Sequence, residues 1–81
     1  MGKKTNNNYQ LILHNDENHS FKDVIISLIE ICEHSDIQAE QCAIIVDLKG
    51  SCCVNINKYS KIIKQKEKLT GKNFKVSIKE I

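Results

Sequence analysis

The stretch YQLILHNDENHSFKD, residues 9–23, decides the fold of this chain and contains its candidate site. It begins with three successive apolar residues, Leu11, Ile12 and Leu13, which predict a strand at 9–14 that is central in its sheet. The polar run that follows predicts a loop. Ser20 then stands where a helix would start.

The loop between this strand and the helix is rich in hydrogen-bond acceptors, because it holds Asn15, Asp16, Glu17 and Asn18 between two histidines. Carboxylates and amide oxygens suit an ammonium group, which has three donors and no acceptor. The loop could therefore be a receptor for a cation. The alternative is a solvated loop whose Asn and Asp side chains form local turns and a helix cap.

Two helices are predicted after the loop. Ser20 with Asp23 at the third helical position forms a carboxylate version of the capping box, and the apolar periodicity continues to about residue 34. Ser35 and Gln38 form a second capping box, and the second helix ends near Gly50, a candidate left-handed C-cap. Such a short connection predicts that the two helices pack against each other.

The remaining chain alternates between strand and helix patterns. Residues 51–57 predict a strand, 58–70 a helix with Gly71 as its C-cap, and 73–81 a last strand. The order β-α-α-β-α-β predicts an α+β sandwich, in which helices cover one face of a small three-stranded, mainly antiparallel sheet. We expect a flexible N-terminal tail at 1–8 and one domain over 9–81.

The composition excludes several classes of protein. A chain of 81 residues with 41% hydrophobic and 27% charged residues is typical of one globular domain. The net charge is only +2 and the lysines are spread along the chain, which argues against nucleic-acid binding. No apolar run approaches the roughly 20 residues that cross a bilayer. A secretion signal is also missing, so we expect a cytoplasmic protein that does not bind a membrane.

Four cysteines, Cys32, Cys42, Cys52 and Cys53, invite a disulfide or zinc interpretation. They include no C-x-x-C pair, and the histidines do not supply the missing ligand spacing. The sequence therefore predicts buried free thiols in a reducing compartment, with no metal and no cofactor.

Three segments, in this order and spacing, resemble the ClpS family of adaptors, which hand N-degron substrates to Clp-type AAA+ proteases. They are LILHNDENHSF, QAEQCAIIVDLKG and NFKVSIKE, and the resemblance covers residues 9–81. It implies a non-enzymatic protein that binds the free α-amino group and the bulky apolar first residue (Leu, Phe, Tyr or Trp) of a substrate. The implied partner is the N-terminal domain of a Clp unfoldase of the ClpA or ClpC type, and we expect the adaptor to be a monomer.

The resemblance also implies which residues form the site. The ligands of the α-ammonium would be Asn15, Asp16, Glu17 and Asp47. The pocket for the first side chain would be lined by Phe21, Val24, Ile25, Ala43 and Phe74, with Ile44 and Leu48 as neighbours.

This chain departs from the family pattern at three places. Asp47 stands where the family has a histidine, and Ala43 stands where it has a bulky residue, usually Met. The stretch between Gly50 and the last strand is also several residues shorter than is typical.

Two other functions remain open at this stage. One is a structural or assembly domain that shares the fold without the pocket, as in the C-terminal domain of a ribosomal stalk protein. Such a domain has no need of an acidic Asn-Asp-Glu cluster beside an apolar cavity. The other is a hydrolase that uses Glu17 and Asp47 with His14 or His19, although no oriented nucleophile, phosphate loop or metal set accompanies them.

Overall fold

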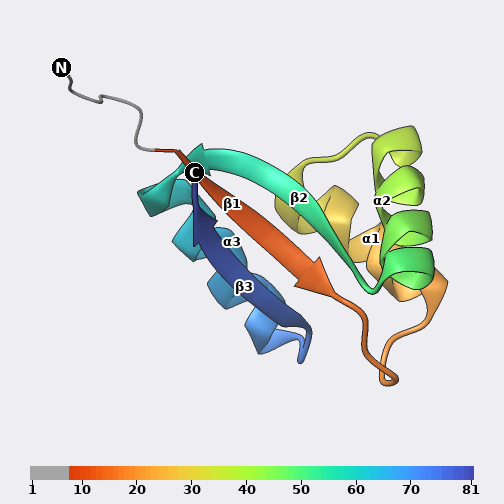
Figure 1. The fold of residues 1–81 in the computed structure, drawn as a ribbon. Helices are drawn as coiled ribbons and strands as arrows, with labels where there is room; N and C mark the ends of the chain where they lie inside the picture. Colours follow the sequence, from red (N-terminus) through yellow and green to blue (C-terminus); the bar gives the residue numbers. More distant parts are fainter. Residues whose placement is uncertain (1–7) are drawn as a thin grey trace, which may run out of the picture.

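The computed structural model describes residues 8–81, and the predicted tail at 1–8 lies outside this range except for Asn8, which begins the first strand. The elements follow in the order β1, α1, α2, β2, α3 and β3 (Figure 1). Their bounds are β1 Asn8–His14, α1 Phe21–Cys32, α2 Asp36–Lys49, β2 Ser51–Lys58, α3 Tyr59–Gly71 and β3 Lys75–Glu80. The predicted β-α-α-β-α-β order and α+β class are confirmed.

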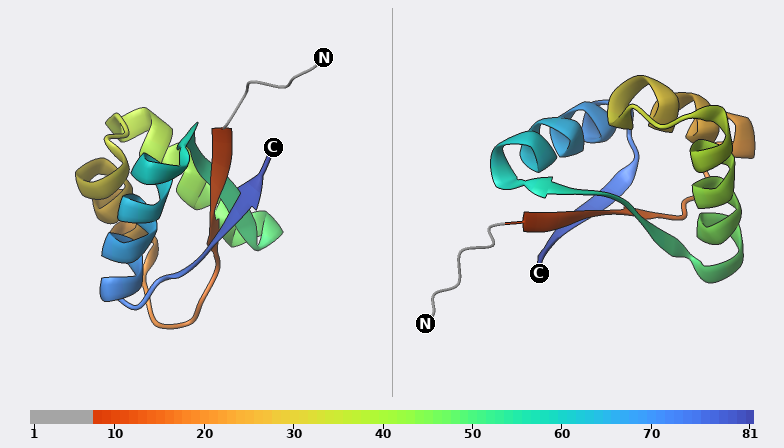
Figure 2. Two further views of the ribbon diagram at one scale, coloured as in Figure 1. Left: turned by 90° about the vertical axis from the view of Figure 1, so that its left-hand side faces the viewer. Right: turned by 90° about the horizontal axis from the view of Figure 1, so that it is seen from above.

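The three strands form one antiparallel sheet with β1 in the centre, in the order β2-β1-β3. Helices α1 and α3 lie over one face of this sheet, and α2 stands across the end of the sheet where β1 finishes and β2 begins, as the right-hand view of Figure 2 shows. The acidic loop therefore leaves the end of the central strand and must cross to the helical layer. It does so beside the start of β2 and the start of β3, because His14 pairs with both Ser51 and Lys75.

Local side-chain chemistry sets the ends of α1 and α2. The Ser20 hydroxyl accepts from the Asp23 N–H at 3.1 Å while the Asp23 carboxylate accepts from the Ser20 N–H at 3.0 Å. Ser35 and Gln38 make the same reciprocal pair at the start of α2. Both predicted capping boxes are present, and each satisfies two of the N–H groups that a helix start leaves open. Gly50 ends α2 with φ +91°, the predicted left-handed cap.

The core lies between the sheet and the helices. Leu11 and Leu13 of β1 point into it with at most 1% of their surface exposed. The buried side chains of Leu28 from α1 and of Ile62 and Leu69 from α3 pack in the same core. Val46 and Ala39 complete it from α2. Alternate residues of β1 therefore serve the core, and the acidic loop begins one residue after the last of them.

A β-bulge in β2 was not predicted. Leu11 pairs with Asn55 and Ile12 with Cys53, so Val54 has no partner across the ladder. Its carbonyl instead accepts a 2.6 Å hydrogen bond from His34 Nε2, in the turn between α1 and α2. The bulge shifts the alternation of the residues that follow it to the other face of the sheet, so Ile56 points away from the core and is half exposed.

Two other expectations about the end of α3 and the cysteines were wrong. Gly71 is the last residue of α3 and has no positive φ; the left-handed residue is Asn73, with φ +69°. Of the four free thiols, only Cys32 is buried, whereas Cys53 is exposed and the other two are intermediate. Burial raises the pKa of the Cys32 thiol to about 11.

Candidate functional site

The acidic loop is attached at its start to the last turn of α2. The Asn15 N–H donates to the Gly50 carbonyl at 2.8 Å. Asp47 lies three residues before Gly50 on the same helix, so this bond brings the loop and the helix end together. The segments LILHNDENHSF and QAEQCAIIVDLKG, which are far apart in the sequence, therefore meet at one place.

The Asp16 carboxylate accepts several hydrogen bonds from within the loop. Its Oδ1 accepts from the backbone N–H groups of Asn18 at 2.8 Å and His19 at 3.0 Å. The His19 ring donates to the same carboxylate through Nδ1, at 3.0 and 3.1 Å from its two oxygens. Only 3% of the Asp16 side chain is exposed. Burial alone would raise the pKa of Asp16, but the hydrogen bonds from His19 and Asn18 outweigh it and lower that pKa.

His19 joins the loop to the turn between α3 and β3. Its Nε2 donates to the Lys72 carbonyl at 2.8 Å, and its ring stacks on Phe74 with centroids 3.7 Å apart and planes 14° from parallel. A backbone carbonyl and an ionised carboxylate are both acceptors, so these contacts fit an imidazolium, the form in which both ring nitrogens carry a hydrogen. Burial acts to lower the pKa of His19, but its bonds to Asp16 and Lys72 outweigh it and raise that pKa above 6.5.

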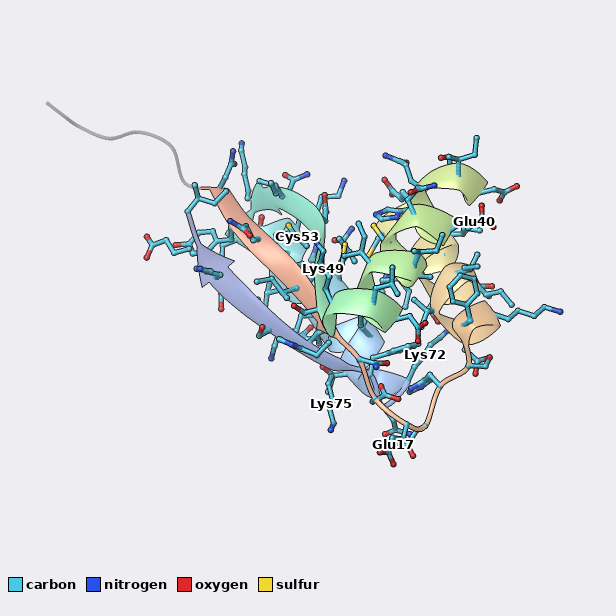
Figure 3. All side chains as sticks on the ribbon, turned by 45° about the vertical axis from the view of Figure 1, so that its right-hand side comes forward. Glu17, Glu40, Lys49, Cys53, Lys72 and Lys75 are labelled. Carbon is cyan, nitrogen blue, oxygen red and sulfur yellow. The ribbon has the colours of Figure 1, made fainter. Side chains whose placement is uncertain are left out.

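Two predicted ligands remain free in the described part of the chain. The Glu17 and Asp47 side chains are exposed, and neither makes a hydrogen bond or ion pair with residues 8–81. Figure 3 shows Glu17 at the tip of the loop, with its carboxylate directed away from the body of the protein. The Asn15 side chain is likewise exposed. These acceptors stand ready for an external donor, whereas Asp16 already has three internal ones.

A cavity of about 260 Å³ opens beside the loop, on the side of α1 that faces the α3–β3 turn. Phe74 and His19 form one wall of it. The other lining residues are Asp23, Ile26, Ser27 and Lys72. Among the five residues predicted to line the side-chain pocket, Phe74 alone belongs to this cavity.

The other predicted pocket residues are placed differently. Phe21 is 45% exposed at the first position of α1, and Val24 and Ile25 are half-buried against the core. Ala43 is buried on α2. Ile44, Asp47 and Leu48, spaced three and four residues apart, share the outer face of that helix, where Leu48 is 78% exposed. The chain thus carries exposed apolar surface next to the free carboxylate of Asp47.

The histidines and cysteines outside the loop have other partners. His14 Nε2 lies 2.8 Å from the Ser77 hydroxyl, across the β1–β3 ladder. Within residues 8–81, no group of three or more His, Cys, Asp and Glu side chains is arranged to hold a metal ion. No helix in the same range is long and apolar enough to cross a membrane.

The contacts of His19 were not predicted from the sequence, although the residue was noted as part of the loop. The signal was the Asp-x-x-His spacing in a loop, because an Asp side chain often accepts from N–H groups two and three residues later and so brings the fourth side chain close. Lys72 and Phe74 are 53 and 55 residues further along the chain than His19, so no local pattern pointed to their contact with it.

Both the sequence and the fold match known proteins. The family model described as "ATP-dependent Clp protease adaptor protein ClpS" matches residues 4–77 of the 81. The fold matches the structure of Agrobacterium tumefaciens ClpS2 bound to L-phenylalaninamide, with a TM-score of 0.83 and 17% sequence identity. That match covers 93% of this chain and 98% of ClpS2. A search of curated proteins found no match. The chain therefore belongs to the ClpS family of Clp protease adaptor proteins.

Proposed function

We propose that this chain is a non-enzymatic adaptor that binds N-degron substrates by their first residue and delivers them to a Clp AAA+ unfoldase. The observation that carries the proposal is the 2.8 Å bond between the Asn15 N–H and the Gly50 carbonyl. It attaches the acidic loop to the end of α2, next to Asp47. The bond therefore brings the start of the loop, at Asn15, to the end of the helix that carries Asp47.

In this proposal, the substrate's α-ammonium donates to the Asn15 side-chain oxygen and to the carboxylates of Glu17 and Asp47. The support is that these side chains are exposed and that neither carboxylate has a partner within residues 8–81. Asp16 stays in the proposed site as a source of negative charge behind the loop, because its oxygens already accept from Asn18 and His19. An ammonium with three donors matches such a set, whereas an acetylated terminus offers one uncharged N–H.

The first side chain of the substrate is proposed to pack on Phe21, Val24, Ile25, Ala43 and Phe74. Phe21 would form an exposed rim, and the buried Ala43 and Phe74 would form the floor. Burying a large apolar side chain contributes about 1.5–3 kcal/mol. The structure of ClpS2 bound to L-phenylalaninamide supports a ligand that combines a free amine with an aromatic side chain.

The remaining parts of the proposal concern partners. The unfoldase N-domain, of the ClpA or ClpC type, would bind a surface away from the loop, near α3 and the edge strand β2, so that the site stays open to substrate. The adaptor would act as a cytoplasmic monomer. A saturating N-degron peptide should then leave unfoldase binding unchanged, and direct competition between the two would contradict separate surfaces.

The test is a titration of fluorescent peptides that begin with Leu, Phe, Trp, Tyr, Ile or Arg, each with a free and an acetylated terminus. We expect binding of free-amine peptides with large apolar first residues and little binding of the acetylated ones. Glu17→Gln and Asp47→Asn should each weaken binding by about 10- to 100-fold, which is the contribution of one hydrogen bond to a charged group.

Glu40→Gln is the matched control, because Glu40 is also an exposed carboxylate but lies towards the other end of α2 (Figure 3). It should bind like the parent. Equal affinities of the parent, Glu17→Gln and Asp47→Asn for a free-amine peptide would refute the ammonium site.

A further inference from the structure

We propose that the imidazolium of His19 is the positioning residue that orders the acidic loop, and that the loop becomes mobile when this ring loses its proton. Where it concerns substrate binding, the inference rests on the proposed function. It makes Asp16 the counter-ion of an internal cation rather than a direct ligand of the substrate.

Two hydrogen bonds hold the acidic loop to distant segments of the chain. Within residues 8–81, the loop from Asn15 to His19 has one backbone bond to a segment distant in the chain, from the Asn15 N–H to the Gly50 carbonyl. At its other end, His19 is the only loop residue whose side chain hydrogen-bonds to a distant segment of the described chain, through its bond to the Lys72 carbonyl. Within residues 8–81, His19 is thus the second anchor of the loop, and it also stacks on the buried Phe74.

Both hydrogen bonds of the His19 ring depend on the positive charge of that ring. A neutral imidazole has one N–H, so it can donate either to Asp16 or to the Lys72 carbonyl but not to both. Losing the proton would place an unprotonated nitrogen against an acceptor that cannot donate to it. One of the two bonds must then open, so the ring loses either its link to Asp16 or its link to the α3–β3 turn.

Charged groups from the loop, from α1 and from the α3–β3 turn lie around the His19 ring. Asp16 in the loop and Asp23 on α1 both favour the protonated ring. Lys72, from the α3–β3 turn, lines the same cavity and opposes it, but its ammonium pairs with Glu30 at 3.1 Å. Phe74, from the segment before β3, contributes no charge. Asp16 and Asp23 therefore shift the charge balance around the ring towards its protonated form.

The sign of the pH effect follows. Because the pKa of His19 in the folded protein is raised, its contribution to loop order is complete below 6.5 and is lost as the pH rises through the folded-state pKa. The Asn18 and His19 N–H groups, which donate to the Asp16 carboxylate, should become mobile together with the ring.

The direct test does not depend on any substrate. NMR of the ¹⁵N-labelled chain should show both ring nitrogens of His19 protonated at pH 6.5 and titrating together above it. The backbone order parameters of Asn18 and His19 should fall over the same range. In His19→Gln they should be low at all pH values, whereas His14→Gln, whose parent ring contacts Ser77, should keep the parent's profile.

A second test links the ring to binding. The affinity of a Phe-initiated peptide should be about tenfold weaker in His19→Gln than in the parent at pH 6, and should converge with it by pH 9. This comparison cancels the titration of the peptide's own amine, which occurs near pH 8. Asp16→Asn should move the His19 titration to lower pH.

The outcomes separate the two proposals. A His19 ring that titrates below 6.5, or loop amides that are equally ordered in the parent and in His19→Gln, would overturn the positioning role. If instead the NMR results are as expected but no peptide binds the parent at any pH, the proposed function fails while the role of His19 in the loop stands.

Discussion

Alanine at Gly50 and alanine at Gly71 should change the stability of the protein in opposite directions, although both glycines end a helix. At neither position would an added Cβ meet an atom of another part of the fold within 4 Å, so contacts with distant segments play no part. The two positions differ in backbone conformation. Gly50 has φ +91°, in the left-handed region, whereas Gly71 has no positive φ.

The magnitudes follow from this difference. A left-handed conformation costs an L-residue about 1–2 kcal/mol, and replacing glycine recovers about 0.4–1 kcal/mol from the unfolded chain. Gly50→Ala should therefore lose about 1 kcal/mol of unfolding free energy, or about 4–8 °C in Tm for a chain of this size. Gly71→Ala should gain about 0.5–1 kcal/mol, because alanine is favoured in a helix. Gly50→Asn should fall between Gly50→Ala and the parent, since asparagine tolerates this conformation.

Urea unfolding followed by far-UV circular dichroism measures the three variants against the parent. With a denaturant slope of roughly 1 kcal/mol per M, the midpoints of the two alanine variants should differ by about 1–2 M. Exchange of the Asn15 amide with solvent should also accelerate in Gly50→Ala, because this amide donates to the Gly50 carbonyl. An unfolding midpoint for Gly50→Ala at or above that of the parent would refute the argument.

The other predictions concern the core, a cap and acid stability. Leu28→Ala should lose about 2–5 kcal/mol of unfolding free energy by urea titration, because Leu28 is fully buried; a loss under 1 kcal/mol would contradict this packing. Ser35→Ala should lose about 1 kcal/mol in the same assay, and Ser60→Ala, at an exposed serine of α3 outside any capping box, should lose less. The pKa of Asp16 is lowered, so its contribution to stability is present above 3.8 and is lost as the pH falls through the folded-state pKa. Thermal melts from pH 2 to 5 should therefore depend less on pH in Asp16→Asn than in the parent, and identical slopes would argue against the Asp16–His19 pair.

The parts of the fold that could be predicted are those determined by residues that are close together in the sequence. Ser20 with Asp23 and Ser35 with Gln38 satisfy helix starts within three residues, and a glycine after an apolar helix predicts a left-handed cap. Each depends on neighbours in the chain, so a single sequence contains the information. Similarly, apolar residues at 11–13 predicted a central strand, because that strand is paired on both edges.

The parts that could not be predicted depend on contacts between distant segments. At the bulge, the Val54 carbonyl accepts a hydrogen bond from His34, twenty residues earlier in the chain. The His19 ring is held by Lys72 and Phe74, which no spacing rule connects to it. The ligand assignments for Asn15, Glu17 and Asp47 came from the family resemblance, and they stay predictions until the peptide titration is done.

The central position of β1 has a mechanical consequence. Because β1 and β3 are antiparallel, Tyr9 lies opposite Glu80, so the first and last described segments leave the sheet side by side (Figure 1). A force that separates these two segments would load the hydrogen bonds between β1 and β3 one pair at a time, as in a zipper, instead of shearing all of them at once. We therefore expect the domain to yield at low force when it is pulled by its two ends. The acidic loop, at the opposite end of β1, would feel the force last.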